Sequence, residues 1–160
     1  MTDDWQVYSA HGQDTITRTY TGMSKDYRRR IFKEHGRTKK SARATQGQTW
    51  KPLYVISGFK TRSHACQFEK ALHMLSRGKK KLPDLKPSDV SYPANCPATW
   101  KRRLFHLYAL IRQPQWTRNG PRVNTYDRTL SIRFFPLVLT NHHASLTEQF
   151  SYSIYRVVSL

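Results

Sequence analysis

The sequence predicts an α+β fold in which a small mixed β-sheet is flanked by helices. Short segments dominated by β-branched and aromatic residues alternate with segments whose apolar residues recur at spacings of three and four. Gly, Pro and capping residues separate most of these segments. The order is strand, strand, helix, strand, helix and then a mixed helix and strand extension, without an internal repeat.

A β-hairpin is expected first. Residues 5–10 (WQVYSA) and 15–21 (TITRTYT) have the composition of strands, and the turn-forming run at 11–14 separates them. Gly22 is expected to end the second strand.

A short helix and a third strand should follow. Asp26 is a suitable N-cap for a helix that ends near His35, and Gly36 is its stop signal. Residues 37–49 are polar and basic, which predicts a loop, and the apolar run at 53–56 (LYVI) predicts a short strand.

A second helix is expected from Ser63, its N-cap, to about Arg77, with Gly78 as its stop. One apolar stripe along it should be buried. The stripe consists of Ala65, Phe68, Leu72 and Leu75.

The rest of the chain mixes element types. Residues 79–97 are rich in lysine and proline and predict an irregular connector, and residues 99–113 predict a helix with one apolar face. Strands are expected at 130–139 and in the tail at 150–158, where a helix that starts at Ser145 is the alternative.

The charge balance points to a polyanionic partner. The chain has 28 Lys and Arg against 10 Asp and Glu, a formal net charge of +18. So large an excess repels itself in the compact state, which favours nucleic acid as the partner, with an anionic membrane surface second. No apolar run is long enough for a membrane span, and MTDDWQVYS is not a secretory signal. Cys66 and Cys96 form no Cys-x-x-Cys pair and are expected to be reduced thiols of a nuclear or cytoplasmic protein.

The run of arginines at the start of the first helix contains one that differs from its neighbours. With a rotation of about 100° per residue, Arg30 shares the side of the apolar residues, whereas Arg28, Arg29 and Lys33 do not. Arg30 can either pair with Glu34 one turn later or bind a phosphate with its guanidinium.

One carboxylate stands apart in the second helix. Glu69 lies at the rim of the buried face, and it is the only acidic residue between Glu34 and Asp84. It can be structural, or it can hold one hard divalent ion that keeps most of its water.

These residues carry a resemblance to the GIY-YIG endonuclease family. The first motif reads QVY at 6–8 and the second reads YTG at 20–22. The family arginine, ten residues after the second tyrosine, corresponds to Arg30, and the metal-binding glutamate corresponds to Glu69 in GFKTRSHACQFE. The resemblance covers about residues 5–76.

Within the family the chain is most similar to the Slx-type structure-specific endonuclease subunit. The segments LFHLYALIRQPQWTRNG and LSIRFF resemble, more loosely, the part that follows the nuclease domain in that subunit. The chain lacks that subunit's C-terminal zinc-binding RING-like domain, so a reduced version from a virus or mobile element is expected. Glu34 occupies the place of the family histidine, which is displaced by one position to His35, and Gln6 replaces a glycine.

The resemblance implies hydrolysis of DNA phosphodiester bonds with one Mg²⁺ or Mn²⁺ ion. Tyr8 would be the general base, with a pKa lowered by nearby cations, and Tyr20 would position water or phosphate. Arg30 would stabilise charge on the phosphate, Glu69 would hold the metal, and His35 completes the implied catalytic set. The domains would be a nuclease domain at 1–78, a basic connector at 79–98 and an extension at 99–160 packed on the nuclease domain.

The expected substrate is branched DNA from repair, recombination or replication, recognised by shape because no base-reading element is evident. The residues expected to contact its phosphates are Arg28, Arg29, Lys33, Arg37, Lys39, Lys40 and Arg43. The lysines at 79–81 are a second contact or a nuclear-targeting patch. A protein scaffold or a second copy of the chain is a further expected partner. The expected location is the nucleus or cytoplasm, which would be that of the host cell if the protein is viral. Two alternatives remain: a restriction or homing-type nuclease whose specificity element lies at 80–160, and a catalytically idle nucleic-acid-binding module.

Overall fold

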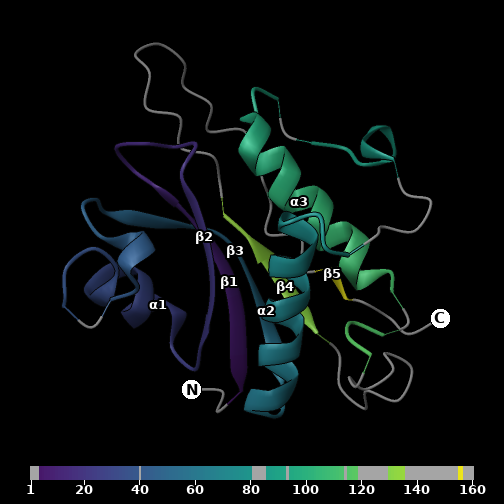
Figure 1. Ribbon diagram of the computed structural model, residues 1–160, viewed down its shortest axis with the longest axis horizontal. Coiled ribbons are helices and arrows are strands. Elements are labelled where there is room, and N and C mark those ends of the chain that lie inside the picture. Colours follow the sequence, from purple (N-terminus) through teal and green to yellow (C-terminus); the bar gives the residue numbers. More distant parts are fainter. Residues whose placement is uncertain are drawn as a thin grey trace.

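The N-terminal segment forms the predicted hairpin in the computed structural model, which describes residues 4–39, 41–80, 86–92, 94–113, 115–118, 130–135 and 155–156 (Figure 1). Strand β1 (Trp5–Gly12) pairs antiparallel with β2 (Thr19–Ser24). The predicted bounds are wrong at the turn, because β1 continues through Gly12 and the second strand begins at Thr19 instead of Thr15. The prediction that Gly22 ends the second strand is wrong, because Gly22 lies inside β2 opposite Tyr8. There the glycine provides space for a neighbouring side chain instead of breaking the strand.

The first helix has the predicted limits and an unexpected interior. Helix α1 (Tyr27–Arg29) passes directly into a π-helical turn, η1 (Arg30–Glu34). The Asp26 carboxylate accepts a hydrogen bond from the Arg29 amide at 2.9 Å, as expected of an N-cap. Gly36 follows the helix with a φ of 72°, the left-handed conformation of a stop residue.

The central strand is much longer than the predicted 53–56. Strand β3 (Trp50–Phe59) begins at Trp50 and ends at Phe59, and both of these side chains are buried. Their burial in the fold extends the strand beyond the apolar run on both sides. The preceding segment is a loop, as predicted, except for a 3₁₀ turn, η2 (Arg43–Thr45). Pro52 is tolerated in this central strand because it lies where the register to β1 shifts.

The two long helices lie close to their predicted positions. Helix α2 (Arg62–Ser76) is capped by Thr61, which accepts a hydrogen bond from the His64 amide at 3.2 Å, so the prediction of Ser63 as the cap is wrong. All four residues of its predicted apolar stripe are buried. Helix α3 (Ala98–Ile111) follows a connector that contains the 3₁₀ turn η3 (Pro87–Asp89).

The strand order in the sheet is β2-β1-β3-β4-β5, where β4 is Ser131–Phe134 and β5 is Tyr155–Arg156. Each described pairing is antiparallel, so the α+β class is confirmed and the expectation of a mixed sheet is corrected. Neighbouring strands of the sheet therefore run in opposite directions throughout the described pairs. The predicted strand 130–139 is described over residues 130–135, where β4 lies, and its remainder lies outside the described residues. Most of the segment of the alternative helix from Ser145 also lies outside them.

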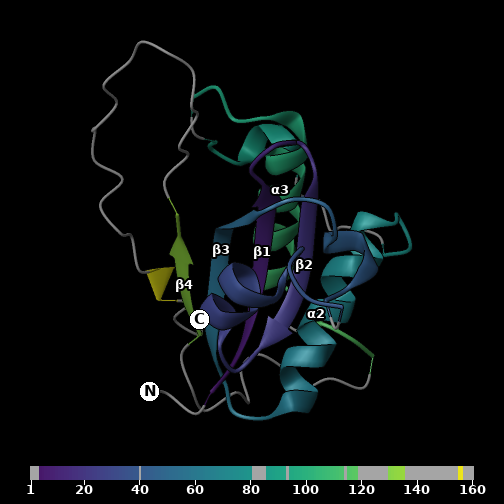
Figure 2. The same ribbon diagram turned by 90° about the vertical axis from the view of Figure 1, so that its left-hand side faces the viewer.

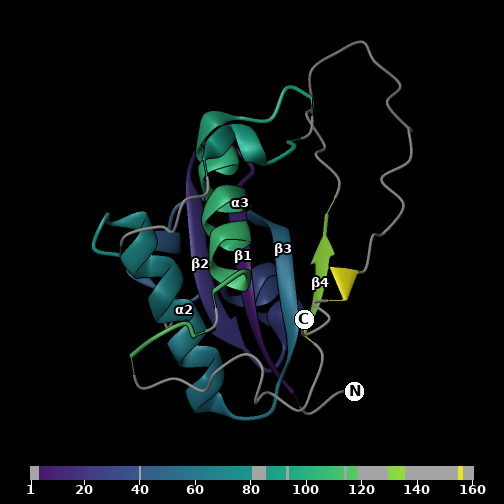
Figure 3. The same cartoon turned by 90° about the vertical axis from the view of Figure 1, so that its right-hand side faces the viewer.

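Helices cover both faces of the sheet. Helices α2 and α3 pack on one face, and α1 with η1 packs on the other (Figures 2 and 3). The larger core lies between the sheet and α2 and α3, and includes Val7, Tyr54 and Trp100. A smaller core on the other face includes Tyr8 and Ile31. In the part of the chain that the structure describes, no helix is long and apolar enough to span a membrane.

Candidate active site

A buried tyrosine–histidine pair lies at the centre of the smaller core. Tyr8 comes from the middle of β1 and His35 from the end of η1, and their side chains are 1% and 0% exposed. The Tyr8 hydroxyl lies 2.7 Å from His35 Nε2, a hydrogen bond between residues 27 positions apart in the sequence. The structure therefore brings together two of the predicted catalytic residues on the α1 face of the sheet.

The π-helical turn explains how His35 reaches Tyr8. The His35 amide donates to the Arg30 carbonyl at 2.9 Å, a hydrogen bond that spans five residues instead of four. A π turn accommodates one extra residue within a helix. The one-position displacement of the histidine from the family spacing is thereby absorbed, and its ring faces the sheet.

The surroundings of His35 keep its imidazole neutral. Burial, followed by the charge of Arg30, lowers the pKa of His35 to about 4. The rings of Tyr20 and Trp50 lie beside it, with centroids at 4.9 Å and 6.4 Å. A neutral ring whose Nε2 accepts from Tyr8 carries its hydrogen on Nδ1, for which the described residues offer no acceptor.

Gly22 creates the space in which the two tyrosines meet. A Cβ atom at this position would lie 2.8 Å from the Tyr8 hydroxyl and 2.9 Å from Tyr20 Cε1. Both distances are shorter than real Cβ contacts, so any side chain here would displace one of the rings. The glycine of the second motif is therefore required by close approach.

The prediction that nearby cations lower the pKa of Tyr8 is wrong. Burial raises the pKa of Tyr8, with Tyr20 as the next contribution, and these effects outweigh the opposing influence of Arg30. The pKa of Tyr20 is also raised, first by burial and then by the charge of Glu69. Both phenols are thus protonated at neutral pH, because desolvation raises their pKa by more than the charge of the half-buried Arg30 lowers it.

Arg30 makes the helical pair with Glu34 that was the first of the two roles left open by its sequence position. Its guanidinium pairs with the Glu34 carboxylate at 2.5 Å, and Glu34 also contacts Arg29 at 3.1 Å. The Glu34 hydrogen bond raises the pKa of Arg30, and the Arg30 hydrogen bond lowers that of Glu34. The same guanidinium lies close enough to Tyr8 to influence its pKa. Glu34 therefore orients Arg30 beside the tyrosine–histidine pair.

Glu69 reaches the site from the other side of the sheet. It lies on α2, its side chain is 22% exposed, and its charge acts on Tyr8 and Tyr20. Its carboxylate lies beside His73, one helical turn later, with 3.5 Å between Glu69 Oε1 and His73 Nε2. The described residues contain no group of three or more His, Cys, Asp or Glu able to hold a metal. A single accessible carboxylate fits a divalent ion that keeps most of its water and binds a substrate phosphate.

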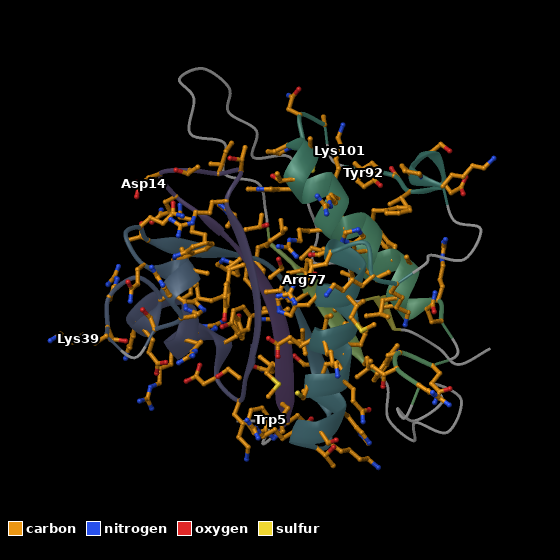
Figure 4. All side chains as sticks on the ribbon, in the orientation of Figure 1. Trp5, Asp14, Lys39, Arg77, Tyr92 and Lys101 are labelled. Carbon is orange, nitrogen blue, oxygen red and sulfur yellow. The ribbon has the colours of Figure 1, made fainter. Side chains whose placement is uncertain are left out.

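The predicted phosphate contacts lie at the surface. Arg28, Arg29 and Lys33 are exposed on the outer side of α1 and η1. In the following loop Arg37, Lys39 and Arg43 are also exposed, and Lys39 points away from the body of the molecule (Figure 4). Lys40 lies outside the described residues.

The lysine run of the connector is less available than its sequence suggests. Lys79 is exposed, but Lys80 is half-buried and donates to the Trp116 carbonyl at 2.5 Å. Burial lowers the pKa of Lys80, and Lys81 lies outside the described residues.

Two supporting contacts were missed from the sequence, whereas the pairing of Glu34 with Arg30 was considered there. The side-chain oxygen of Gln6, Oε1, accepts a hydrogen bond from the Tyr27 amide at 3.2 Å, so the residue that replaces the motif glycine anchors the start of α1. Trp50 stands against His35 and donates from Nε1 to the Thr45 carbonyl at 2.8 Å. Neither contact has a local sequence signal. Glu34 did have one, its i+4 spacing from Arg30.

The two tyrosines, the histidine and the arginine of this site lie within the segment that is similar to a known family. Residues 5–81 match the model of the GIY-YIG catalytic domain. The match covers a little less than half of the chain.

The chain is also similar to a protein of Acanthamoeba polyphaga mimivirus named "Uncharacterized protein L300". The two are 29% identical over 113 residues, which cover 66% of this chain and 66% of the viral protein. The similarity thus spans slightly less than two thirds of that relative.

Proposed function

We propose that the protein is a metal-dependent endonuclease that hydrolyses phosphodiester bonds in branched DNA, with Mg²⁺ or Mn²⁺ held by Glu69. The observation that carries the proposal is the 2.7 Å contact between the Tyr8 hydroxyl and the neutral His35 ring, beside Arg30. The contact gives the tyrosine a proton acceptor inside the segment that matches the GIY-YIG catalytic domain.

The raised pKa of Tyr8 decides how this tyrosine would act as a base. A free phenolate is disfavoured in the buried site, so Tyr8 would pass one proton on as it takes another. Water gives a proton to the Tyr8 oxygen, and the Tyr8 hydroxyl proton moves to His35 Nε2. The resulting hydroxide attacks phosphorus and the P–O bond to the leaving oxygen breaks. Tyr8 stays neutral throughout. Because burial and Arg30 lower the pKa of His35 to about 4, His35 would hold the proton only while negative charge develops on the phosphate.

The remaining residues would stabilise the reacting phosphate. Arg30, oriented by Glu34, donates to the phosphate oxygens as negative charge develops on them. Tyr20 positions the attacking water or a phosphate oxygen. The divalent ion, when bound at Glu69, supplies positive charge beside the leaving oxygen.

Branched DNA is supported by two features. The chain resembles the Slx-type structure-specific nuclease, and its exposed basic residues would contact phosphates without an evident base-reading element. The similarity to a mimivirus protein supports a viral origin. A scaffold protein or a second copy of the chain is proposed as a partner.

The test is a cleavage panel with the full chain in Mg²⁺, using linear duplex, flap and four-way DNAs. Flap or four-way DNA should be cut faster than duplex of the same length. Glu69→Gln should abolish cleavage and retain DNA binding, because the phosphate contacts lie elsewhere. Cutting of duplex at one defined sequence would instead favour the restriction or homing-type reading, and binding without cleavage by the wild type would favour the idle module.

A further inference from the structure

A histidine next to the proposed metal ligand has no role in this scheme. His73 follows Glu69 by four residues on α2, and its side chain is 36% exposed. Residues four apart on a helix lie on the same face, one turn above the other. Both side chains therefore face the same solvent-accessible surface of α2.

The distance between the two side chains corresponds to that of two ligands of one metal ion. Metal–nitrogen and metal–oxygen bonds to such ions are about 2.1 Å long. Two such bonds at about 90° place the ligand atoms about 3.0 Å apart, and at about 110° the separation is about 3.4 Å. The 3.5 Å between His73 Nε2 and Glu69 Oε1 needs only a small adjustment to reach this range.

The pairing does not require a metal, but its contribution as an ion pair is small. A partly exposed i, i+4 pair stabilises a helix by about 0.2–0.5 kcal/mol. The direct contact is also long for a hydrogen bond. The geometry is at least as well suited to a shared ion, since helical ligands four residues apart hold metals in other sites.

We propose that Glu69 and His73 together form a two-ligand metal site that accepts a transition-metal ion such as Co²⁺ or Zn²⁺ more tightly than Mg²⁺. The inference rests on the proposed function, in which Glu69 holds the ion. Imidazole is a good ligand for these ions and a poor one for Mg²⁺, which prefers oxygen. The remaining coordination positions stay open for water and a substrate phosphate. His73 thus favours the binding of these ions over Mg²⁺ at Glu69.

The test is isothermal titration of the untagged full chain with Co²⁺ and, separately, Mg²⁺. The wild type should bind Co²⁺ at least about tenfold more tightly than Mg²⁺ at this site. His73→Ala should weaken Co²⁺ binding by about tenfold and leave Mg²⁺ binding within about twofold. His64→Ala, on the first turn of the same helix, is the matched control and should leave both affinities unchanged.

A second measurement keeps the inference independent of the variants. Addition of Co²⁺ to the wild type should shift or broaden the imidazole resonances of His73 in an NMR spectrum before those of His64. Unchanged Co²⁺ affinity in His73→Ala, or unaffected His73 resonances, would overturn the inference. Failure of the proposed function would give a different result, namely Mg²⁺-dependent cleavage by Glu69→Gln.

Discussion

Replacement of His35 by glutamine should flatten the dependence of stability on pH. His35 is fully buried, and its pKa falls from an ordinary 6.5 to about 4 in the folded protein. The unfolded chain therefore binds a proton at this residue between about pH 6.5 and pH 4, and the folded protein does not. The stabilisation is complete above pH 6.5 and is lost as the pH falls to about 4. A difference of about 2.5 pKa units corresponds to about 3 kcal/mol.

The assay is urea denaturation of wild type and His35→Gln between pH 7.5 and pH 4. The wild type should lose about 3 kcal/mol more than the variant over that range. His106→Gln is the control, because the pKa of His106 is also lowered to about 4 by burial, and this variant should retain the His35 contribution. Equal losses in wild type and His35→Gln would refute the argument that burial holds His35 neutral.

Three further predictions concern the site and the DNA surface. Gly22→Ala should destabilise the fold by about 1–3 kcal/mol and abolish cleavage, because its Cβ would displace Tyr8 or Tyr20; urea denaturation and a cleavage assay measure the two effects. Arg30→Ala should lower the single-turnover rate on bound DNA by about 10²-fold or more. Arg28→Ala, at an exposed position, should mainly raise the Kd for DNA. Equal behaviour of the two variants would contradict the assignment of the two arginines to different helix faces. Neutralising the exposed loop cations should reduce the slope of log Kd against log salt by about two to three, without changing the rate at saturating protein. That triple variant is R37A/K39A/R43A.

Local signals in the sequence were sufficient for the first helix and for the face of Arg30. Asp26 and Gly36 act through their own backbone neighbours, so their positions define the helix ends. The apolar stripe of α2 was predictable for the same reason, because helical spacing alone determines it.

Features that depend on tertiary contacts were not predictable. The π turn occurs where His35 contacts Tyr8. Apolar residues at helical spacing predict a helix here, but they do not distinguish an α-helical turn from a π-helical one. The raised pKa of Tyr8 results from burial, which a count of nearby cations in the sequence does not reveal. The full length of β3 likewise depends on Trp50 and Phe59, whose burial is decided by the rest of the fold.

The most direct test of the account compares two buried tyrosines on neighbouring strands. Tyr8 bonds to His35 on one face of the sheet, and Tyr54 is equally buried in the larger core on the other face. The measurement is the single-turnover cleavage rate of bound branched DNA by Tyr8→Phe and by Tyr54→Phe. The account predicts that Tyr8→Phe lowers the rate by about 10²–10⁴-fold, while Tyr54→Phe cleaves at nearly the wild-type rate. Cleavage by Tyr8→Phe at the rate of Tyr54→Phe would contradict the assignment of the Tyr8–His35 pair as the proton-transfer centre.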